Sequence, residues 1–203
     1  MKKLILASNN QKKIKEIKEI LKGEEIEVLS LKDVNLDIDV VEDGKTFEDN
    51  AFKKSNEIYV ALLEKGFNNF IVMSDDSGIE VDYLNGEPGV YSARYAGEHG
   101  NDKLNNKKLL ENLKGVKKEE RGARFICHIA LIDNNKQYIG VRGEVEGYIL
   151  EEERGEGGFG YDPLFFYEPL NKSFGEISSE DKNKISHRGK ALNNIKDKIK
   201  ELL

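Results

Sequence analysis

The chain has 203 residues, of which 34% are charged and 38% hydrophobic, and its formal net charge is −6. This length suits one large domain or two closely packed lobes with a sizeable core. The acidic balance argues against a general nucleic-acid coat protein, which needs a surplus of lysine and arginine, but it permits a small anionic substrate. With a single cysteine, Cys127, and an N-terminal apolar run of only Leu4 to Ala7, we expect a cytoplasmic protein without a signal peptide.

The chain opens with a pattern typical of a strand, a polar turn and a helix. Leu4 to Ala7 is apolar, and from Ile14 onward apolar residues recur at spacings of three and four. The turn between them ends in Lys12 and Lys13. Backbone N–H groups at a helix start attract anions, and these lysines add positive charge. The same turn also fits an ordinary cap on a lysine-rich surface helix.

A strand at Ile26 to Leu31 and a long helix are predicted next. Thr46 is a good N-cap with Asp49 three residues later, and the following apolar residues share one face of a helix of about five turns that ends near Gly66. Glu42 lies in the loop before this helix. Its carboxylate either reaches a metal or is a solvated loop acid.

The central stretch carries the densest polar cluster. The apolar run Phe70 to Met73 leads into Ser74-Asp75-Asp76-Ser77-Gly78, so we expect a buried strand to end there and Gly78 to allow a sharp exit. Adjacent carboxylates repel each other unless a cation or a proton lies between them, and Mg2+ takes such oxygen ligands. The alternative is a plain polar turn.

Further along, Ile79, Val81 and Tyr83 alternate as in a strand, and Asp102 to Leu113 has helical spacing. The clearest hairpin joins Ala123 to Asp133 with Gln137 to Tyr148.

A glycine-rich loop follows at Glu151 to Gly160. Glycine lets the backbone approach a flat ligand, on which Phe159 or Tyr161 would stack, although the loop matches neither a dinucleotide fingerprint nor a P-loop.

Three basic side chains precede the predicted terminal helix, namely Lys182, His187 and Arg188. Two interpretations are open. In one, these side chains bind an anion or donate hydrogen bonds to a carbonyl group of a ligand; in the other, they form an ordinary basic surface.

Six motifs, in order, make the chain similar to the inosine triphosphate pyrophosphatase family, also called dITP/XTP pyrophosphatases, and most of all to its bacterial members. Each motif alone is weak, but six in the right order form a strong signal that favours function at Glu42, at the first turn and at the last. The motifs are Ser8–Lys13, Glu42–Ala51, Ser74–Gly78, Pro88–Arg94, Gly158–Pro163, and Lys182 with Ser186–Arg188.

The resemblance implies a Mg2+-dependent enzyme that hydrolyses ITP, dITP and XTP to the monophosphate and pyrophosphate, which keeps deaminated purines out of DNA and RNA. It implies an α/β fold with an elongated, curved mixed β-sheet and flanking helices. Residues 1–203 would form a single domain with two lobes around one catalytic cleft. The family's members are usually homodimers, and we expect no nucleic-acid or membrane partner.

The resemblance also assigns roles. Asp76 would be the general base and, with Glu42, would bind Mg2+. In the first turn Ser8, Asn10 and Lys13 would hold the triphosphate; at the other end Phe159 would stack on the purine, Asp162 would help read its edge, and Lys182, His187 and Arg188 would contact the base and favour a 6-keto group. The other residues expected in the substrate site are Asn9, Gln11, Lys12, Ser77, Gly160 and Tyr161.

Two positions depart from the family pattern. Asn9 stands where glycine is frequent, and Gly175 where alanine is. Asparagine tolerates left-handed backbone angles better than most residues, so we expect Asn9 to leave the loop functional.

Two other functions remain open from the sequence. One is a related pyrophosphatase that acts on modified pyrimidines or on the standard triphosphates, as in the Maf-like group. The other is a non-catalytic nucleotide-binding protein, although the intact Glu42, Asp76 and Lys13 argue against it.

Overall fold

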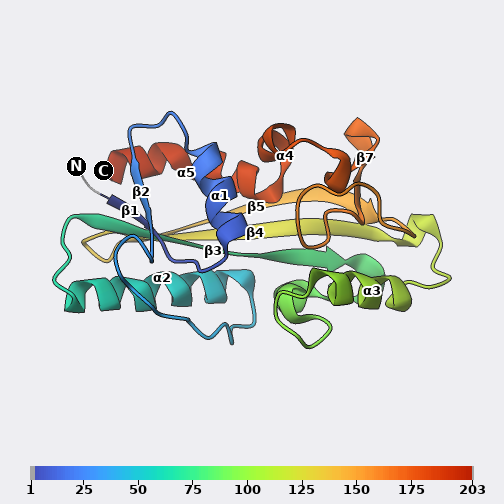
Figure 1. Cartoon of the computed structure of the whole chain (residues 1–203), viewed down its shortest axis with the longest axis horizontal. Helices are drawn as coiled ribbons and strands as arrows, with labels where there is room; N and C mark the ends of the chain where they lie inside the picture. The colour runs from blue at the N-terminus through green and yellow to red at the C-terminus, as the bar shows by residue number, and fades with distance from the viewer. Residues whose placement is uncertain (1–2, 203) are drawn as a thin grey trace. The chain divides into compact units, whose positions relative to one another are not determined.

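One open sheet of seven strands, in the order β2-β1-β3-β4-β5-β6-β7, carries the fold (Figure 1). It is described by a computed structural model for residues 3–202. The sheet is mixed, because β1 pairs in parallel with β2 and β3, whereas β6 pairs antiparallel with β5 and β7. The strands are β1 (Lys3–Leu6), β2 (Glu27–Ser30), β3 (Phe70–Val81), β4 (Gly122–Ile132), β5 (Tyr138–Ile149), β6 (Phe165–Tyr167) and β7 (Lys172–Ser173).

Five α-helices flank the sheet in the described part of the chain. They are α1 (Gln11–Ile20), α2 (Phe47–Glu64), α3 (Asp102–Asn112), α4 (Ser179–Ile185) and α5 (His187–Leu202). The chain divides into two compact units: the first holds the residues before Ser77, Cys127–Gly143 and the residues from Arg188 onward, and the second holds Ser77–Ile126 and Glu144–His187.

In the first unit, strand β1 is buried on both faces. Leu4 and Leu6 pack toward α1 and α5, whereas Ile5 packs toward α2 with Phe70 and Val72 of β3. Figure 1 shows α2 on one side of these strands and α1 and α5 on the other. Successive side chains of a strand point to opposite faces, so a strand covered on both sides needs the continuous apolar run that the sequence has here.

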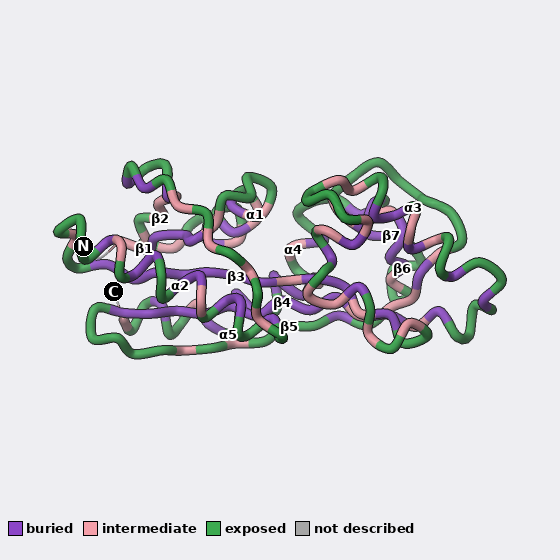
Figure 2. Tube along the Cα trace, turned by 90° about the horizontal axis from the view of Figure 1, so that it is seen from below, coloured by how far each residue is buried: buried purple, intermediate pink, exposed green. Residues whose placement is uncertain are grey.

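The second unit has its own apolar core. Leu109 of α3 and Leu113, which caps this helix, pack with Ile79 of β3 and Phe125 of β4 in one buried cluster. The ring of Phe125 lies 4.7 Å from that of Phe165, centroid to centroid. In Figure 2 the strand cores are buried and the connecting segments largely exposed.

The predicted end of the central strand was wrong. Strand β3 runs on through Ser74–Gly78 to Val81, and Asp75 and Asp76 are buried inside it. The strand continues because these polar groups find partners there; the Ser74 hydroxyl, for example, donates to the carbonyl of Ala51. Tyr83, which the alternating pattern assigned to a strand with Ile79 and Val81, lies instead in a short 3-10 turn after β3.

The other predicted elements are largely confirmed. The hairpin is formed by β4 and β5, which are neighbours in the sheet, and α2 begins after Thr46 with the expected capping box to Asp49. Near the C-terminus, Lys182 lies within α4, and His187 and Arg188 begin α5 rather than precede it.

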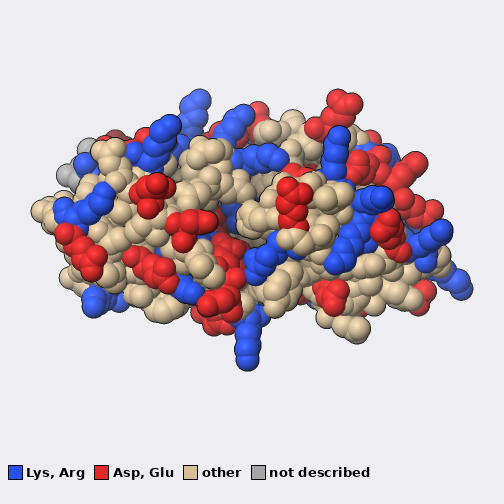
Figure 3. Space-filling model, turned by 60° about the horizontal axis from the view of Figure 1, so that its bottom comes forward, with Lys and Arg blue, Asp and Glu red and all other residues tan. Residues whose placement is uncertain are grey.

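The surface carries both signs of charge. Lysine and arginine alternate with aspartate and glutamate over the face shown in Figure 3, so that face has no broad basic area. Within residues 3–202, no helix combines the length and apolar character that crossing a membrane requires.

Candidate active site

The turn after β1 is fixed by its own side chains. The Ala7 N–H donates to the carbonyl of Met73 at 2.7 Å, which holds the turn beside β3. Asn10 caps α1, since its Oδ1 accepts the N–H groups of Lys12 at 3.1 Å and Lys13 at 3.2 Å, and Ser8 Oγ accepts the N–H of Asn10. The interpretation as a cap is therefore correct, and Asn10 occupies N–H groups that an anion would otherwise bind.

Asn9 and Gln11 are exposed and stabilise this turn. Asn9 Nδ2 donates to the carbonyl of Ile38 at 3.0 Å, and Gln11 Nε2 approaches the carbonyl of Asn9 at 3.5 Å. Asn9 has no positive φ, so the replacement of glycine here costs no left-handed strain.

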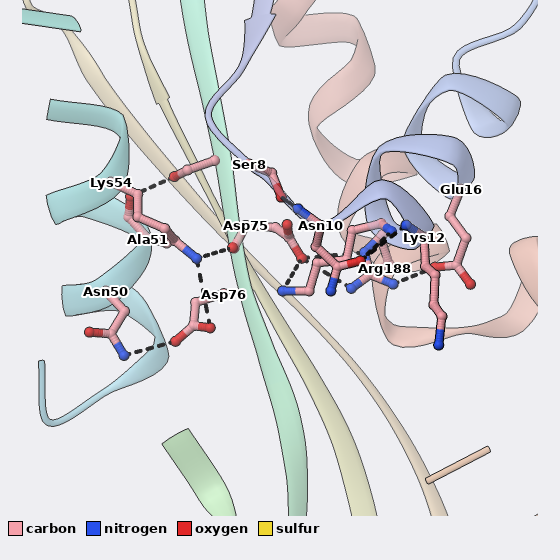
Figure 4. Close-up of polar contacts among 12 residues, drawn as sticks. Ser8, Asn10, Lys12, Glu16, Asn50, Ala51, Lys54, Asp75, Asp76 and Arg188 are labelled. Atoms are coloured by element: carbon pink, nitrogen blue, oxygen red, sulfur yellow. Dashed lines mark hydrogen bonds and ion pairs between the residues drawn. The ribbon is translucent and has the colours of Figure 1, made fainter. Parts of the chain in front are cut away.

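Asp75 is the anion of a buried ion-pair network. Its Oδ2 lies 3.0 Å from Arg188 Nη2 and 3.2 Å from Lys13 Nζ (Figure 4). Arg188 also donates to Glu16. Burial opposes ionisation of Asp75, but the charges of Lys13, Arg188 and Lys54 hold the pKa of this carboxyl well below its usual range. Asp75 is therefore ionised and holds Lys13 in place.

A second cluster surrounds Lys54, a residue that the sequence analysis missed. Lys54 Nζ lies 2.6 Å from the Asp75 carbonyl oxygen and 3.9 Å from Asp76 Oδ1 (Figure 4). It also lies 2.6 Å from Glu42 Oε1. Asn50, one turn earlier on α2, donates to Asp76 Oδ2 at 2.9 Å. A lysine on the helix face that also carries the buried Ile58 was the signal for this site, because lysine is rarely buried without a partner.

The surroundings shift the pKa values of Asp76 and Glu42 in opposite directions. Burial raises the pKa of Asp76, although Lys54 and Lys13 oppose the shift. Burial also works against ionisation of Glu42, but Lys54 outweighs it and lowers the pKa of that carboxyl. Lys54 remains charged because Asp76 and Glu42 raise its pKa despite its burial. Of the two carboxyls, Asp76 is therefore the one that accepts a proton more readily.

These carboxylates fit a metal that arrives with a phosphate ligand. Within residues 3–202, no three histidine, cysteine, aspartate or glutamate side chains are grouped closely enough to hold a metal ion by themselves. Glu42 and Asp76, however, converge on one cation, Lys54. Mg2+ is commonly bound by one or two carboxylates together with substrate phosphates, so this donor set suits it.

In the second unit, the glycine-rich loop is folded around Asp162. The Asp162 Oδ2 accepts the N–H of Phe159 at 2.7 Å and a bond from Lys182 Nζ at 2.6 Å. Lys182 Nζ also lies 4.9 Å from the centre of the Phe159 ring. The structure therefore brings together Phe159, Asp162 and Lys182, three of the five residues to which the resemblance assigns contact with the base.

Of the other residues predicted for the substrate site, Tyr161 and His187 are buried in the second unit, and Arg188 belongs to the first unit. Tyr161 is a core residue whose hydroxyl donates to the Ser92 carbonyl at 2.8 Å, so the half-buried Phe159 is the more accessible of the two rings. His187 is buried and stacks on Phe125, with ring centroids 4.8 Å apart. Arg188 belongs to the first unit, with Asp75 and Glu16, and its contact with a base stays a prediction. The half-buried Ser77 follows Asp76 within β3.

A sequence model of the Ham1 family matches residues 4–198 of the chain. The chain belongs to the Ham1 family. A dITP/XTP pyrophosphatase of Clostridium perfringens is 60% identical over 203 residues, which cover 100% of both chains. One of Bacillus subtilis is 46% identical over 195 residues, or 96% of each chain. The solved structure of the Staphylococcus aureus Ham1 protein matches with a TM-score of 0.85 at 41% identity, covering 98% of this chain and 99% of that one.

Membership of the Ham1 family confirms the resemblance that the six motifs suggested, and the solved relative confirms the mixed-sheet α/β fold. In the second position that departs from the family pattern, Gly175, a Cβ would lie 2.7 Å from the carbonyl oxygen of Arg154. Glycine at this position therefore allows the loop after β5 to approach the segment after β7 closely.

Proposed function

We propose that the chain is a nucleoside triphosphate pyrophosphatase that hydrolyses ITP, dITP and XTP to the monophosphate and pyrophosphate. The observation that carries the proposal is the position of Asp76, a buried carboxyl with a raised pKa that shares Lys54 with Glu42. The names of the Ham1 relatives, which are dITP/XTP pyrophosphatases, support the same activity.

In this proposal the first unit binds the triphosphate. A nucleoside triphosphate carries about four negative charges, which a chain of net charge −6 binds only through local cations. Ser8, Lys12 and Lys13 supply hydroxyl and ammonium donors at the start of α1. Glu42 and Asp76 would hold Mg2+, which when bound neutralises charge on the phosphate oxygens.

Asp76 would act as the general base. It takes a proton from the attacking water, whose oxygen forms a bond to the α-phosphorus, and the bond from that phosphorus to the bridging oxygen breaks and releases pyrophosphate. Asn50, which donates to Asp76 Oδ2, holds the carboxylate in one orientation. Before the substrate binds, the positive charge of Lys54 offsets the negative charges of Asp76 and Glu42.

The second unit would bind the base. Phe159 offers a ring for stacking, and the paired Asp162 and Lys182 supply an acceptor and a donor beside it. A donor directed at a 6-keto oxygen meets another donor when adenine enters, and each unpaired buried polar group costs about 1–3 kcal/mol. Two such mismatches are enough for discrimination on the order of a hundredfold.

Replacing Asp76 tests this function directly. Asp76→Asn keeps the shape and the bond from Asn50 but removes the base, so we expect turnover of ITP at saturating Mg2+ to fall by about 100-fold or more. The matched control is Asp43→Asn, which removes an exposed carboxylate of the Glu42 loop that pairs with Lys53. Near-normal turnover by Asp76→Asn would contradict the assignment.

We also propose the homodimer that the resemblance implies. A solution mass near twice that of the chain supports it, and the mass of a single chain would contradict it.

A further inference from the structure

Helix α3 contacts both backbone polar groups of one residue in the glycine-rich loop. The Gly160 N–H donates to Asp102 Oδ2 at 3.0 Å, and the Gly160 carbonyl accepts from Asn106 Nδ2 at 3.2 Å. Asp102 and Asn106 are four residues apart, so they lie on the same face of α3. Together they fix the direction of the peptide groups on both sides of Gly160.

Asn106 also forms a hydrogen bond with a residue near the beginning of the glycine-rich loop. Its Nδ2 donates to Glu153 Oε1 at 2.9 Å, and the side chain is 4% exposed. The helix that carries it is itself anchored, because Leu109 and Leu113 are buried in the core of the second unit. One turn of a fixed helix therefore holds two points of the loop, at Glu153 and at Gly160.

The first part of the loop is also held by backbone hydrogen bonds, which run from the Arg154 N–H to the Pro163 carbonyl and from the Gly157 N–H to the Gly175 carbonyl, both at 2.9 Å. Residues 151–158 are exposed, and Gly158 and Gly160 have positive φ and no side chain to pack. Phe159 stands between these two glycines. The N–H of Phe159 donates to Asp162 Oδ2, and its carbonyl accepts the N–H of Asp162 at 3.3 Å. The next residue, Gly160, is held by Asp102 and Asn106 of α3.

From this geometry we propose that Asp102 and Asn106 are positioning residues that fix Phe159 in the orientation in which it stacks on the purine base. The inference rests on the proposed function and adds to it the residues that set affinity for the base. A ring held in its binding orientation before the ligand arrives loses less conformational entropy on binding. Neither residue needs to touch the nucleotide for this effect.

The principal variant is Asn106→Ala, since alanine is the best helix former and preserves α3. Losing a hydrogen bond of this kind should raise KM for ITP and the Kd for IMP, measured by calorimetry, about three- to tenfold. The kcat for ribose 5′-triphosphate, which has no base, should not change. Asp102→Ala should act in the same direction, whereas Lys103→Ala and Lys107→Ala, exposed on the same helix, should have no effect.

A double-mutant cycle with Phe159→Ala decides whether the effect passes through the ring. In a Phe159→Ala background, Asn106→Ala should cause no further loss of IMP affinity. The proposal would be overturned if the losses of IMP affinity from Asn106→Ala and Phe159→Ala were additive, or if Asn106→Ala left the Kd for IMP unchanged. It would also be overturned if the wild-type chain bound no measurable IMP, or if Asn106→Ala impaired turnover of ribose 5′-triphosphate as much as that of ITP. If the wild-type chain does not hydrolyse ITP, the proposed function fails, and the calorimetric cycle still decides the role of Asn106.

Discussion

At the scale of single residues, the site depends on charges that neutralise one another inside the protein. The Asp75 and Arg188 side chains are 0% and 1% exposed, and they are paired at 3.0 Å. Bringing such charges out of water is costly, and the cost is recovered only while both partners are present. The two residues are 113 positions apart in the chain, so no local pattern in the sequence predicted their contact.

Removing one partner of this pair should therefore destabilise the protein strongly. Asp75→Asn removes the charge that pairs with both Arg188 and Lys13 and leaves the buried Arg188 paired with Glu16, so we expect a loss of about 3–5 kcal/mol in the free energy of unfolding at pH 7. Urea titration measures the loss, with Asp43→Asn as the matched control at an exposed ion pair, where little change is expected.

The same variant predicts a pH dependence. The pKa of Asp75 is lower in the folded protein than in the unfolded chain, so its ionisation stabilises the fold above about pH 4 and progressively less as the pH falls below that value. The difference in stability between the wild type and Asp75→Asn should therefore narrow in acid. A difference that is the same at pH 7 and pH 3 would contradict this account of Asp75.

At the scale of elements, β3 and the glycine-rich loop position the reactive side chains in different ways. Strand β3 keeps Asp75 and Asp76 inside the sheet, because cationic side chains on α1, α2 and α5 pair with them. The loop instead depends on glycines that let its backbone wrap around a carboxylate. Gly158 has φ +75°, and a Cβ there would overlap with Asp162 Oδ2.

Gly158→Ala should therefore impair base binding beyond its cost in stability. The added methyl group displaces the Asp162 carboxylate from the N–H of Phe159 and from Lys182, so we expect KM for ITP to rise about tenfold or more. The control is Gly86→Ala, at φ +90° in open space. Both variants should lose about 1–2 kcal/mol of stability from left-handed strain, and equal KM values for the two would contradict the prediction.

Elements with local signals were predictable from the sequence. The capping box of α2 and the β4–β5 hairpin follow from neighbouring residues, and both are confirmed. The continuation of β3 through two aspartates was not predictable, because a polar run ends a strand unless distant residues supply partners. Lys54 and the contacts of α3 with Gly160 were missed for the same reason, since each depends on tertiary contacts.

At the scale of the whole molecule, the two units divide the proposed chemistry. The first unit holds Asp76, Glu42 and the basic start of α1, and the second holds Phe159, Asp162 and Lys182. The six motifs indicated both groups of residues in advance, but only the structure gives their partners. The chain is acidic overall, with a net charge of −6, so its affinity for an anionic substrate must come from these local groups.

We propose that Asp76 and its neighbours direct water to the α-phosphorus of a nucleotide with a 6-keto purine. Chromatographic analysis of the products from ITP, XTP, ATP and GTP, each with and without Mg2+, tests it most directly. We predict the monophosphate and pyrophosphate, formed only with the metal and much faster from ITP and XTP than from ATP. Release of IDP and phosphate from ITP would instead place the attack at the γ-phosphorus and contradict the account.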